Sequence, residues 1–192
     1  HEVNVPDYPL FHYQPYELAL SSKLVDMVKA HNIDVLHVHY AIPHAYAAYM
    51  AKKMLHEEGI DVPIVTTLHG TDVTLVGSHP FYKTAVTFSI NKSDAVTSVS
   101  QNLKEVTQRL FNTQKEIKVV PNFIDLEKYK TTHTDCARDI LARPEERVIT
   151  HVSNFRPVKR IADVIEIFYK IQNELPAKLM MVGEGPERKQ AE

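Results

Sequence analysis

Apolar residues recur along the chain with two alternating spacings, which predict alternating strands and helices. Short β-branched runs that end at polar or turn residues are typical of buried strands in a parallel sheet. Longer segments with an apolar residue at every third or fourth position are typical of amphipathic helices. The pattern predicts strands at 3–5, 33–40, 62–68, 94–99, 117–120, 147–152 and 178–182, and helices at about 15–31, 43–58, 81–92, 101–111, 136–142 and 161–171.

Strands and helices that alternate in this way assemble as right-handed βαβ units around a parallel sheet. The polar, irregular segment 122–134 interrupts the alternation, so we expect a domain boundary near residues 122–130. The predicted fold class is α/β, with two Rossmann-like parallel-sheet domains over 1–125 and 126–192. Because the first five residues already resemble a strand and the second segment holds few elements, both domains are expected to be incomplete.

The composition argues against several classes of function. A net charge of −2 gives no reason to expect binding to nucleic acid or to a membrane surface. No apolar run approaches the roughly 20 residues that cross a bilayer. The single cysteine, Cys136, excludes an intrachain disulfide and fits a reducing compartment, so a cytoplasmic location is expected. Neither a Gly-x-Ser-x-Gly nucleophile turn nor a phosphate-binding P-loop occurs in the sequence.

The first candidate site is the turn formed by His69 and Gly70, directly after the strand predicted at 62–68. Ligands of open α/β sheets bind just beyond the carboxyl ends of the strands. A neutral imidazole in that position can hydrogen-bond a sugar hydroxyl or a developing charge. A capped loop without any chemistry fits the same spacing.

The second candidate is a histidine-rich strand end. Period-2 alternation puts His37 and His39 on one face of their strand, with Tyr40 at its end. Either the histidines are packing residues beside an edge tyrosine, or Tyr40 donates a hydrogen bond into a cleft. A metal site that adds His44 and His69 is a further alternative. No Cys-x-x-Cys, His-Glu-x-x-His or carboxylate cluster accompanies these histidines, so no metal is expected.

The third candidate is the loop 153–160, which connects a strand to a strongly amphipathic helix and carries Arg156, Lys159 and Arg160. A helix N-terminus attracts anions, and cations beside it strengthen phosphate binding. We therefore favour a phosphate site over a solvated basic loop. Gly183 and Gly185 follow the next strand, where a Gly-x-Gly pair fits either a nucleotide site or a tight turn.

Taken together, these segments resemble the retaining glycosyltransferases of family 4, which have the two-domain GT-B architecture. The order and spacing of several short motifs over nearly the whole chain carry the resemblance. The motifs are Asp34-Val35-Leu36-His37-Val38-His39, Thr67-Leu68-His69-Gly70, Ser93-Asp94-Ala95-Val96-Thr97-Ser98-Val99-Ser100, Val120-Pro121-Asn122-Phe123-Ile124-Asp125, the loop 153–159 and Val182-Gly183-Glu184-Gly185-Pro186. A closer similarity, to bacterial family members of bacillithiol biosynthesis, is found in segments 4–11, 37–45 and 153–160.

This resemblance implies transfer of N-acetylglucosamine from UDP-N-acetylglucosamine to the hydroxyl of L-malate, with retention at the anomeric carbon. In such enzymes the donor lies mainly on the C-terminal domain and the acceptor mainly on the N-terminal one. The expected partners are these two small molecules, and no cofactor is expected. The protein could also form a homo-oligomer. The alternatives are another GT-B enzyme, such as a UDP-N-acetylglucosamine 2-epimerase, and a non-enzymatic sugar-binding module.

The resemblance also assigns donor-site residues. His69 matches the active-site histidine that faces the donor sugar, and Lys159 matches the lysine that neutralises the diphosphate. The family's usual arginine partner and its preceding glycine are replaced here by Asn154 and Ser153. Arg156 is therefore expected to supply the second positive charge, and all four loop residues are donor-site candidates.

Malate carries two carboxylates, so its site needs hydrogen-bond donors or cations. Tyr40, Thr67 and Lys83 are the candidates for this acceptor site. In the resembling family a glycine-rich loop precedes the position of His1, and an acidic region that contacts the donor follows the position of Glu192. The 192-residue chain alone is therefore expected to be inactive.

Overall fold

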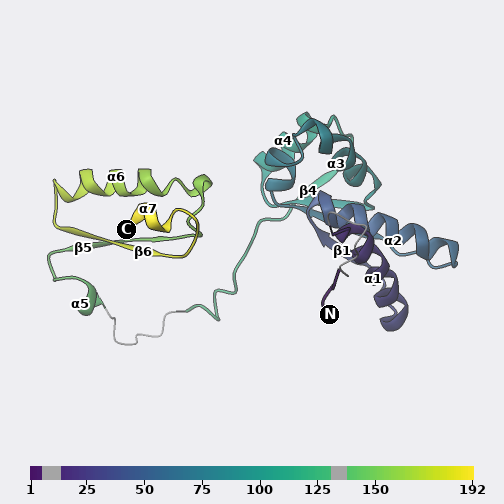
Figure 1. Ribbon diagram of the computed structural model, residues 1–192, viewed down its shortest axis with the longest axis horizontal. Coiled ribbons are helices and arrows are strands. Elements are labelled where there is room, and N and C mark those ends of the chain that lie inside the picture. The colour runs from purple at the N-terminus through teal and green to yellow at the C-terminus, as the bar shows by residue number, and fades with distance from the viewer. Residues whose placement is uncertain (6–13, 131–137) are drawn as a thin grey trace. The chain divides into compact units, whose positions relative to one another are not determined.

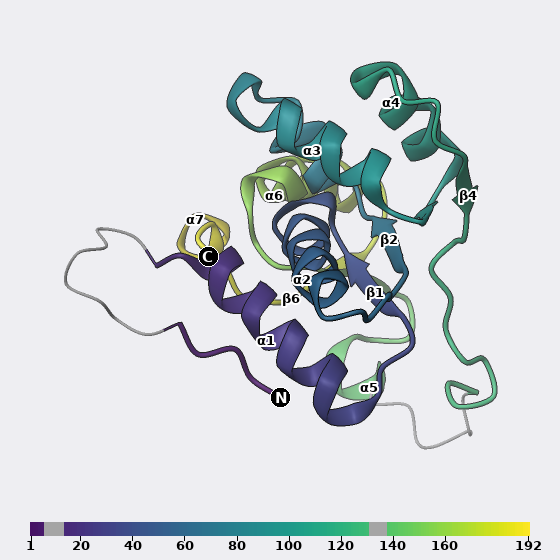
Figure 2. The same ribbon diagram turned by 90° about the vertical axis from the view of Figure 1, so that its right-hand side faces the viewer.

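The computed structural model describes residues 1–5, 14–130 and 138–192. The chain divides into two compact units, His1–Ile124 and Asp125–Glu192, each of which is built on its own parallel sheet (Figures 1 and 2). Cys136, the start of the helix predicted at 136–142 and most of the segment 4–11 lie outside the described residues.

The first unit contains a four-stranded parallel sheet in the order β1-β2-β3-β4. Its strands are β1 (Leu36–His39), β2 (Ile64–Leu68), β3 (Ala95–Ser98) and β4 (Ile117–Val119). Its helices are α1 (Tyr16–His31), α2 (Tyr46–Glu57), α3 (Pro80–Lys92) and α4 (Gln101–Phe111), and the helical turns η1 (Ala41–Ala45) and η2 (Thr71–Leu75) follow β1 and β2. Because the strand order is the chain order, right-handed crossovers put α2, α3 and α4 on the same face of the sheet.

The alternation of side chains along each strand creates the core on that face. Leu36 and Ile64 pack with α1 and α2 in one buried cluster, and Val96 and Ile117 pack with α3 and α4 in another. The intervening strand residues point to the opposite face, since successive side chains of a strand alternate. That second face carries the polar side chains from which the candidate site is built.

The second unit is smaller. It consists of α5 (Arg138–Leu141), β5 (Arg147–Val152), the turn η3 (Pro157–Lys159), α6 (Ile161–Gln172), β6 (Ala177–Val182) and α7 (Arg188–Ala191). Strands β5 and β6 pair in parallel over their full length, and α6 is the crossover helix that runs along them (Figure 1). Ile161, the first residue of α6, and Phe155 are nearly fully buried.

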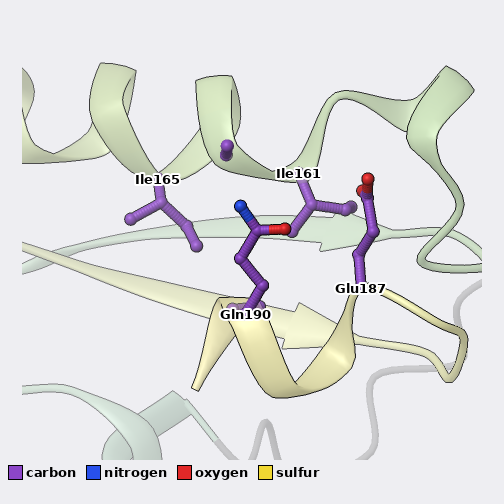
Figure 3. A pocket seen from close by; sticks show the side chains of 6 residues that line it. Ile161, Ile165, Glu187 and Gln190 are labelled. Atoms are coloured by element: carbon purple, nitrogen blue, oxygen red, sulfur yellow. The ribbon is translucent and has the colours of Figure 1, made fainter.

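A small void lies between α6 and α7 in this unit. Ile161 and Ile165 of α6 line one side of it, and the Glu187 and Gln190 side chains reach toward it from the other (Figure 3). Its volume of about 10 Å³ is comparable with that of one water molecule, so it is a packing gap rather than a substrate site.

The predicted α/β class and the two parallel sheets are confirmed. The strand predicted at 3–5 is wrong: residues 1–5 adopt no regular structure and pair with no strand of the described chain. An apolar alternation cannot form a strand without a neighbour for its backbone groups. No helix in the described ranges is long and apolar enough to span a bilayer.

Candidate active site

A groove of about 410 Å³ lies over the face of the first unit's sheet that carries His37, His39 and Thr67, toward the carboxyl ends of the strands. Its polar lining comes from three neighbouring strands and the segment after β4. The polar lining residues are His37, His39, Thr67, His69, Thr97 and Asn122, and the apolar ones are Val65, Val99, Val120, Pro121 and Phe123. Parallel pairing places His39 opposite Thr67 and Thr67 opposite Thr97, which aligns these side chains across the sheet.

A row of hydrogen bonds crosses the floor of this groove. Thr97 Oγ1 and Thr67 Oγ1 are 2.8 Å apart, and Thr67 Oγ1 is also 2.8 Å from His37 Nε2. The Thr67 residue is only 8% exposed. Its hydroxyl therefore already has two partners, one on each neighbouring strand, and it holds the His37 imidazole in place.

His69 lies just after the end of β2 and is contacted from two sides. His39 Nδ1 lies 2.7 Å from His69 Nε2, and the ring centroids of His69 and Tyr40 are 5.0 Å apart. The Nδ1–H of His44 donates a 2.6 Å hydrogen bond to the carbonyl of His39. Partial burial, and then the neighbouring imidazoles of His37, His69 and His44, lower the pKa of His39 below its usual range.

Tyr40 has an unusual backbone conformation, with φ of 75° and ψ of 134°. Its N–H donates a 2.9 Å hydrogen bond to the carbonyl of Thr67, so β1–β2 pairing continues up to this residue. A bulky residue with positive φ costs on the order of 1–3 kcal/mol, and such residues concentrate at ligand sites. This backbone conformation turns the chain sharply after β1, and the Tyr40 ring then lies beside His69.

Asp72 anchors the two strand-end turns and is a site residue that the sequence reasoning missed. It is 3% exposed, and its carboxylate accepts hydrogen bonds from the backbone N–H groups of Ala41, Gly70 and His69 at 2.9, 3.0 and 3.3 Å. An acidic residue in the first turn of a helix can reach back to the N–H of the N-cap residue, here Gly70, and this is the signal that was available. The bond to Ala41, by contrast, depends on the tertiary fold.

The loop after β5 in the second unit is held against the loop after β6. The N–H of Ser153 donates to Val182 O at 3.1 Å, and the N–H of Phe155 donates to Glu184 O at 2.9 Å. His151 Nε2 lies 2.8 Å from Ser153 Oγ. The two loops thus continue the parallel pairing beyond the strand ends.

The glycines of the second loop permit this close approach. A Cβ atom on Gly183, where φ is 147°, would lie 1.8 Å from Ser153 O, and one on Gly185 would lie 2.6 Å from Phe155 O. The Gly-x-Gly pair therefore shapes the 153–155 loop by backbone contact. Both alternatives left open for it, a tight turn and a nucleotide site, are compatible with this role.

The basic residues of the 153–160 loop are exposed and precede a helix of 12 residues. Arg160 forms an ion pair with Asp163, whereas neither Arg156 nor Lys159 is within ion-pair distance of a carboxylate among the described residues. Lys159 lies in the turn η3, where its N–H donates to Arg156 O at 2.8 Å. Two cationic side chains thus lie just before the N-terminus of α6, where an anion would be stabilised.

The structure brings together some of the predicted site residues. Tyr40, Thr67 and His69 meet at adjoining strand ends of the first unit, and Thr67 and His69 line the groove. Tyr40 does not line the groove, and neither does Lys83, which lies exposed on α3. Ser153, Asn154, Arg156 and Lys159 share one loop of the second unit. Across the described ranges, no three His, Cys, Asp or Glu side chains are grouped closely enough to hold a metal ion.

A model of the family described as Glycosyltransferase Family 4 matches residues 1–128 and so includes both strand-end turns of the first unit. The chain belongs to glycosyltransferase family 4. The resemblance noted in the sequence is thereby confirmed.

One curated relative is similar over almost the whole chain. It is the N-acetyl-alpha-D-glucosaminyl L-malate synthase of Bacillus anthracis, which is 47% identical over 188 residues, or 97% of this chain. The aligned region is 49% of that enzyme, so the chain spans about half the length of this relative.

Solved structures share the fold at low sequence identity. The sucrose-phosphate synthase of Thermosynechococcus elongatus matches 94% of this chain and 46% of its own, with a TM-score of 0.64 and 16% identity. The UDP-N-acetylglucosamine 2-epimerase of Rickettsia bellii matches 95% of this chain and 47% of its own, with a TM-score of 0.52 and 11% identity. The predicted GT-B fold class is confirmed by these matches together with the two parallel sheets.

Proposed function

We propose that the full-length protein transfers N-acetylglucosamine from UDP-N-acetylglucosamine to the hydroxyl of L-malate, with retention of configuration, as a step of bacillithiol biosynthesis. The observation that carries this proposal is the 47% identity to the Bacillus anthracis synthase over 97% of the chain. At that coverage the similarity includes both the His69 turn and the 153–159 loop.

On the second unit, we assign Lys159 and Arg156 to the diphosphate of the donor. Breaking the glycosidic bond leaves negative charge on UDP, and preorganised cations and helix N–H groups stabilise such charge. Lys159 acts as a point charge, while the Arg156 guanidinium can bind two phosphate oxygens. Ser153 and Asn154 contribute neutral donors from the same loop. No cofactor or metal takes part in this scheme.

On the first unit, we assign His69 to the donor sugar. In the reaction the bond between the anomeric carbon and UDP breaks, and the malate oxygen bonds to the same face of that carbon. The malate hydroxyl proton passes to an oxygen of the leaving phosphate, so no protein base is required. His69 then acts as an orienting and electrostatic group.

The surroundings of the three acceptor-site candidates suggest a different role for each. Tyr40 is the strongest candidate, because its strained backbone places the ring beside His69. Thr67 already has hydrogen bonds to His37 and Thr97, so we propose that it shapes the floor of the groove. Lys83 is exposed on α3 and remains a prediction from the charge of malate alone.

A product assay with the full-length protein tests the function. The protein is incubated with UDP-N-acetylglucosamine and a panel of hydroxy acids, and the products are identified by mass spectrometry. We expect a conjugate of N-acetylglucosamine with L-malate. Consumption of the donor without consumption of malate would instead support the 2-epimerase alternative.

The cytoplasmic location and a homo-oligomeric state remain predictions.

A further inference from the structure

His39 contacts His69 through a side-chain hydrogen bond that the proposed function does not use. The two imidazoles come from neighbouring strands, because His39 pairs with Thr67 and His69 lies two residues further along. His39 Nδ1 is 2.7 Å from His69 Nε2, and the ring centroids are 5.0 Å apart. A distance of 2.7 Å is a short N···N hydrogen bond, and one ring must donate while the other accepts.

This contact restricts what His69 can present to a ligand. Its Nε2 is occupied by His39, so Nδ1 is the ring nitrogen that remains for a substrate hydroxyl or oxygen. The backbone of His69 is fixed separately, since Asp72 accepts its N–H. The ring orientation is therefore set by His39 on one side and by the Tyr40 ring on the other.

We propose that His39 is a positioning residue, which holds the His69 imidazole in one orientation and in the tautomer that complements its own, and thereby directs its Nδ1 to the substrate. This inference rests on the proposed role of His69 at the donor sugar. Histidines in functional sites commonly have their tautomer set by the partner of the second ring nitrogen. Here that partner is itself an imidazole.

Several titratable groups surround the His39–His69 pair. The titratable groups nearest the two rings are His37 of β1, Tyr40 directly after β1, His44 of η1 and the Asp72 carboxylate of η2. Partial burial and the three neighbouring imidazoles lower the pKa of His39 below its usual range, which favours the neutral form of its ring. A neutral His39 can hold the His69 ring without adding a positive charge beside the sugar.

Substitutions that copy one ring nitrogen at a time separate this role from a structural one. In the full-length enzyme, His39→Asn keeps a polar group near the position of Nδ1, whereas His39→Gln moves it to the position of Nε2. We expect His39→Asn to keep kcat within a few-fold of wild type. His39→Gln and His39→Ala should each lower kcat by about tenfold to a hundredfold, with little change in the affinity for UDP-N-acetylglucosamine. His56→Gln, on the exposed end of α2, is the matched control.

A measurement independent of catalysis completes the test. Long-range ¹H–¹⁵N spectra of histidine-labelled full-length protein report the tautomer of His69, which should be single in wild type and mixed in His39→Ala. An unchanged tautomer in His39→Ala, or equal kcat in the Asn and Gln variants, would overturn the proposal. If wild type forms no malate conjugate while the tautomer still responds to His39, the proposed function fails and the pairing itself is supported.

Discussion

The carboxylate of Asp72 accepts a hydrogen bond from the backbone N–H of Ala41, which lies 31 residues earlier in the chain, at 2.9 Å. The same carboxylate accepts from the N–H of Gly70 at 3.0 Å. One buried side chain thus connects the turn after β1, which carries Tyr40, to the turn after β2, which carries His69. Burying a carboxylate is costly unless hydrogen bonds compensate it, and these backbone donors supply that compensation.

Replacing Asp72 with Asn should therefore destabilise the protein. The amide keeps one acceptor oxygen but turns an NH₂ group toward a backbone N–H that then has no acceptor. We expect a loss of about 2 kcal/mol in the free energy of unfolding, measured by urea titration. Asp34→Asn, at an exposed position, is the control and should change little. An Asp72→Asn variant as stable as wild type would show that the carboxylate does not hold the two turns.

The sequence predicted most of the elements because their patterns are local. The Ser100 cap of α4 is an example, since its Oγ accepts from Leu103 N–H at 3.1 Å as the capping rule requires. The helix predicted at 43–58 agrees with the structure, because α2 ends at Glu57 and residues 43–45 of η1 lead into its start with a helical backbone. The local pattern does not show the kink at Ile42, the one residue of η1 that is not helical.

The candidate site was only partly predictable, since its contacts depend on strand register. Alternation placed His37 and His39 on one face, and the structure confirms this with ring centroids 4.9 Å apart. The bond from His39 to His69 follows only once His39 is known to pair with Thr67. Likewise, the contact of Gly183 with Ser153 exists only because β5 and β6 pair through Val152 and Val182.

Gly183→Ala should distort the loop that carries the donor-site candidates. The new Cβ would meet the carbonyl oxygen of Ser153, and the φ of 147° is itself unfavourable for alanine. We expect a loss of more than about 2 kcal/mol in stability, together with weaker binding of UDP-N-acetylglucosamine by the full-length protein. Gly59→Ala is a matched control, because φ there is also positive, at 79°, but no atom lies within 4 Å of the new Cβ. Equal effects of both variants would contradict the close-approach explanation.

Lys159→Ala should weaken donor binding by removing a charge-assisted contact to the diphosphate. Hydrogen bonds to charged groups contribute roughly 1.5–3 kcal/mol, which corresponds to about a tenfold to a hundredfold increase in Kd. Isothermal titration calorimetry of the full-length protein with UDP measures this change. Lys170→Ala, near the other end of α6, removes the same charge from an exposed ion pair with Glu166 and should bind UDP normally. Unchanged affinity of Lys159→Ala would exclude the phosphate role.

His69→Ala should lower turnover more than it weakens substrate binding. An orienting and electrostatic group acts mainly in the transition state, so its loss reduces kcat while the dissociation constant of the donor changes little. Steady-state kinetics of the full-length enzyme, together with calorimetry for the donor, separate the two effects. A wild-type kcat in His69→Ala would remove His69 from the site, and a large loss of affinity at constant kcat would make it a binding residue instead.

The environment of Asp94 predicts how the free energy of unfolding depends on pH. Partial burial alone would raise the pKa of its carboxyl, but hydrogen bonds from the Lys52 ammonium and from the N–H of Ile64 outweigh this and lower it. Since the folded pKa lies below the unfolded one, the stabilisation is complete above the unfolded pKa and is lost as the pH falls through the folded pKa.

Asp94→Asn should therefore lower the free energy of unfolding by about 1 kcal/mol near pH 7, a modest value because both side chains of the ion pair are partly exposed. Urea unfolding of wild type and variant from pH 7 to pH 3 should show the difference shrinking below about pH 4. A difference that stays constant, or grows, as the solution is acidified would show that the carboxylate charge does not stabilise the junction of β2 and β3.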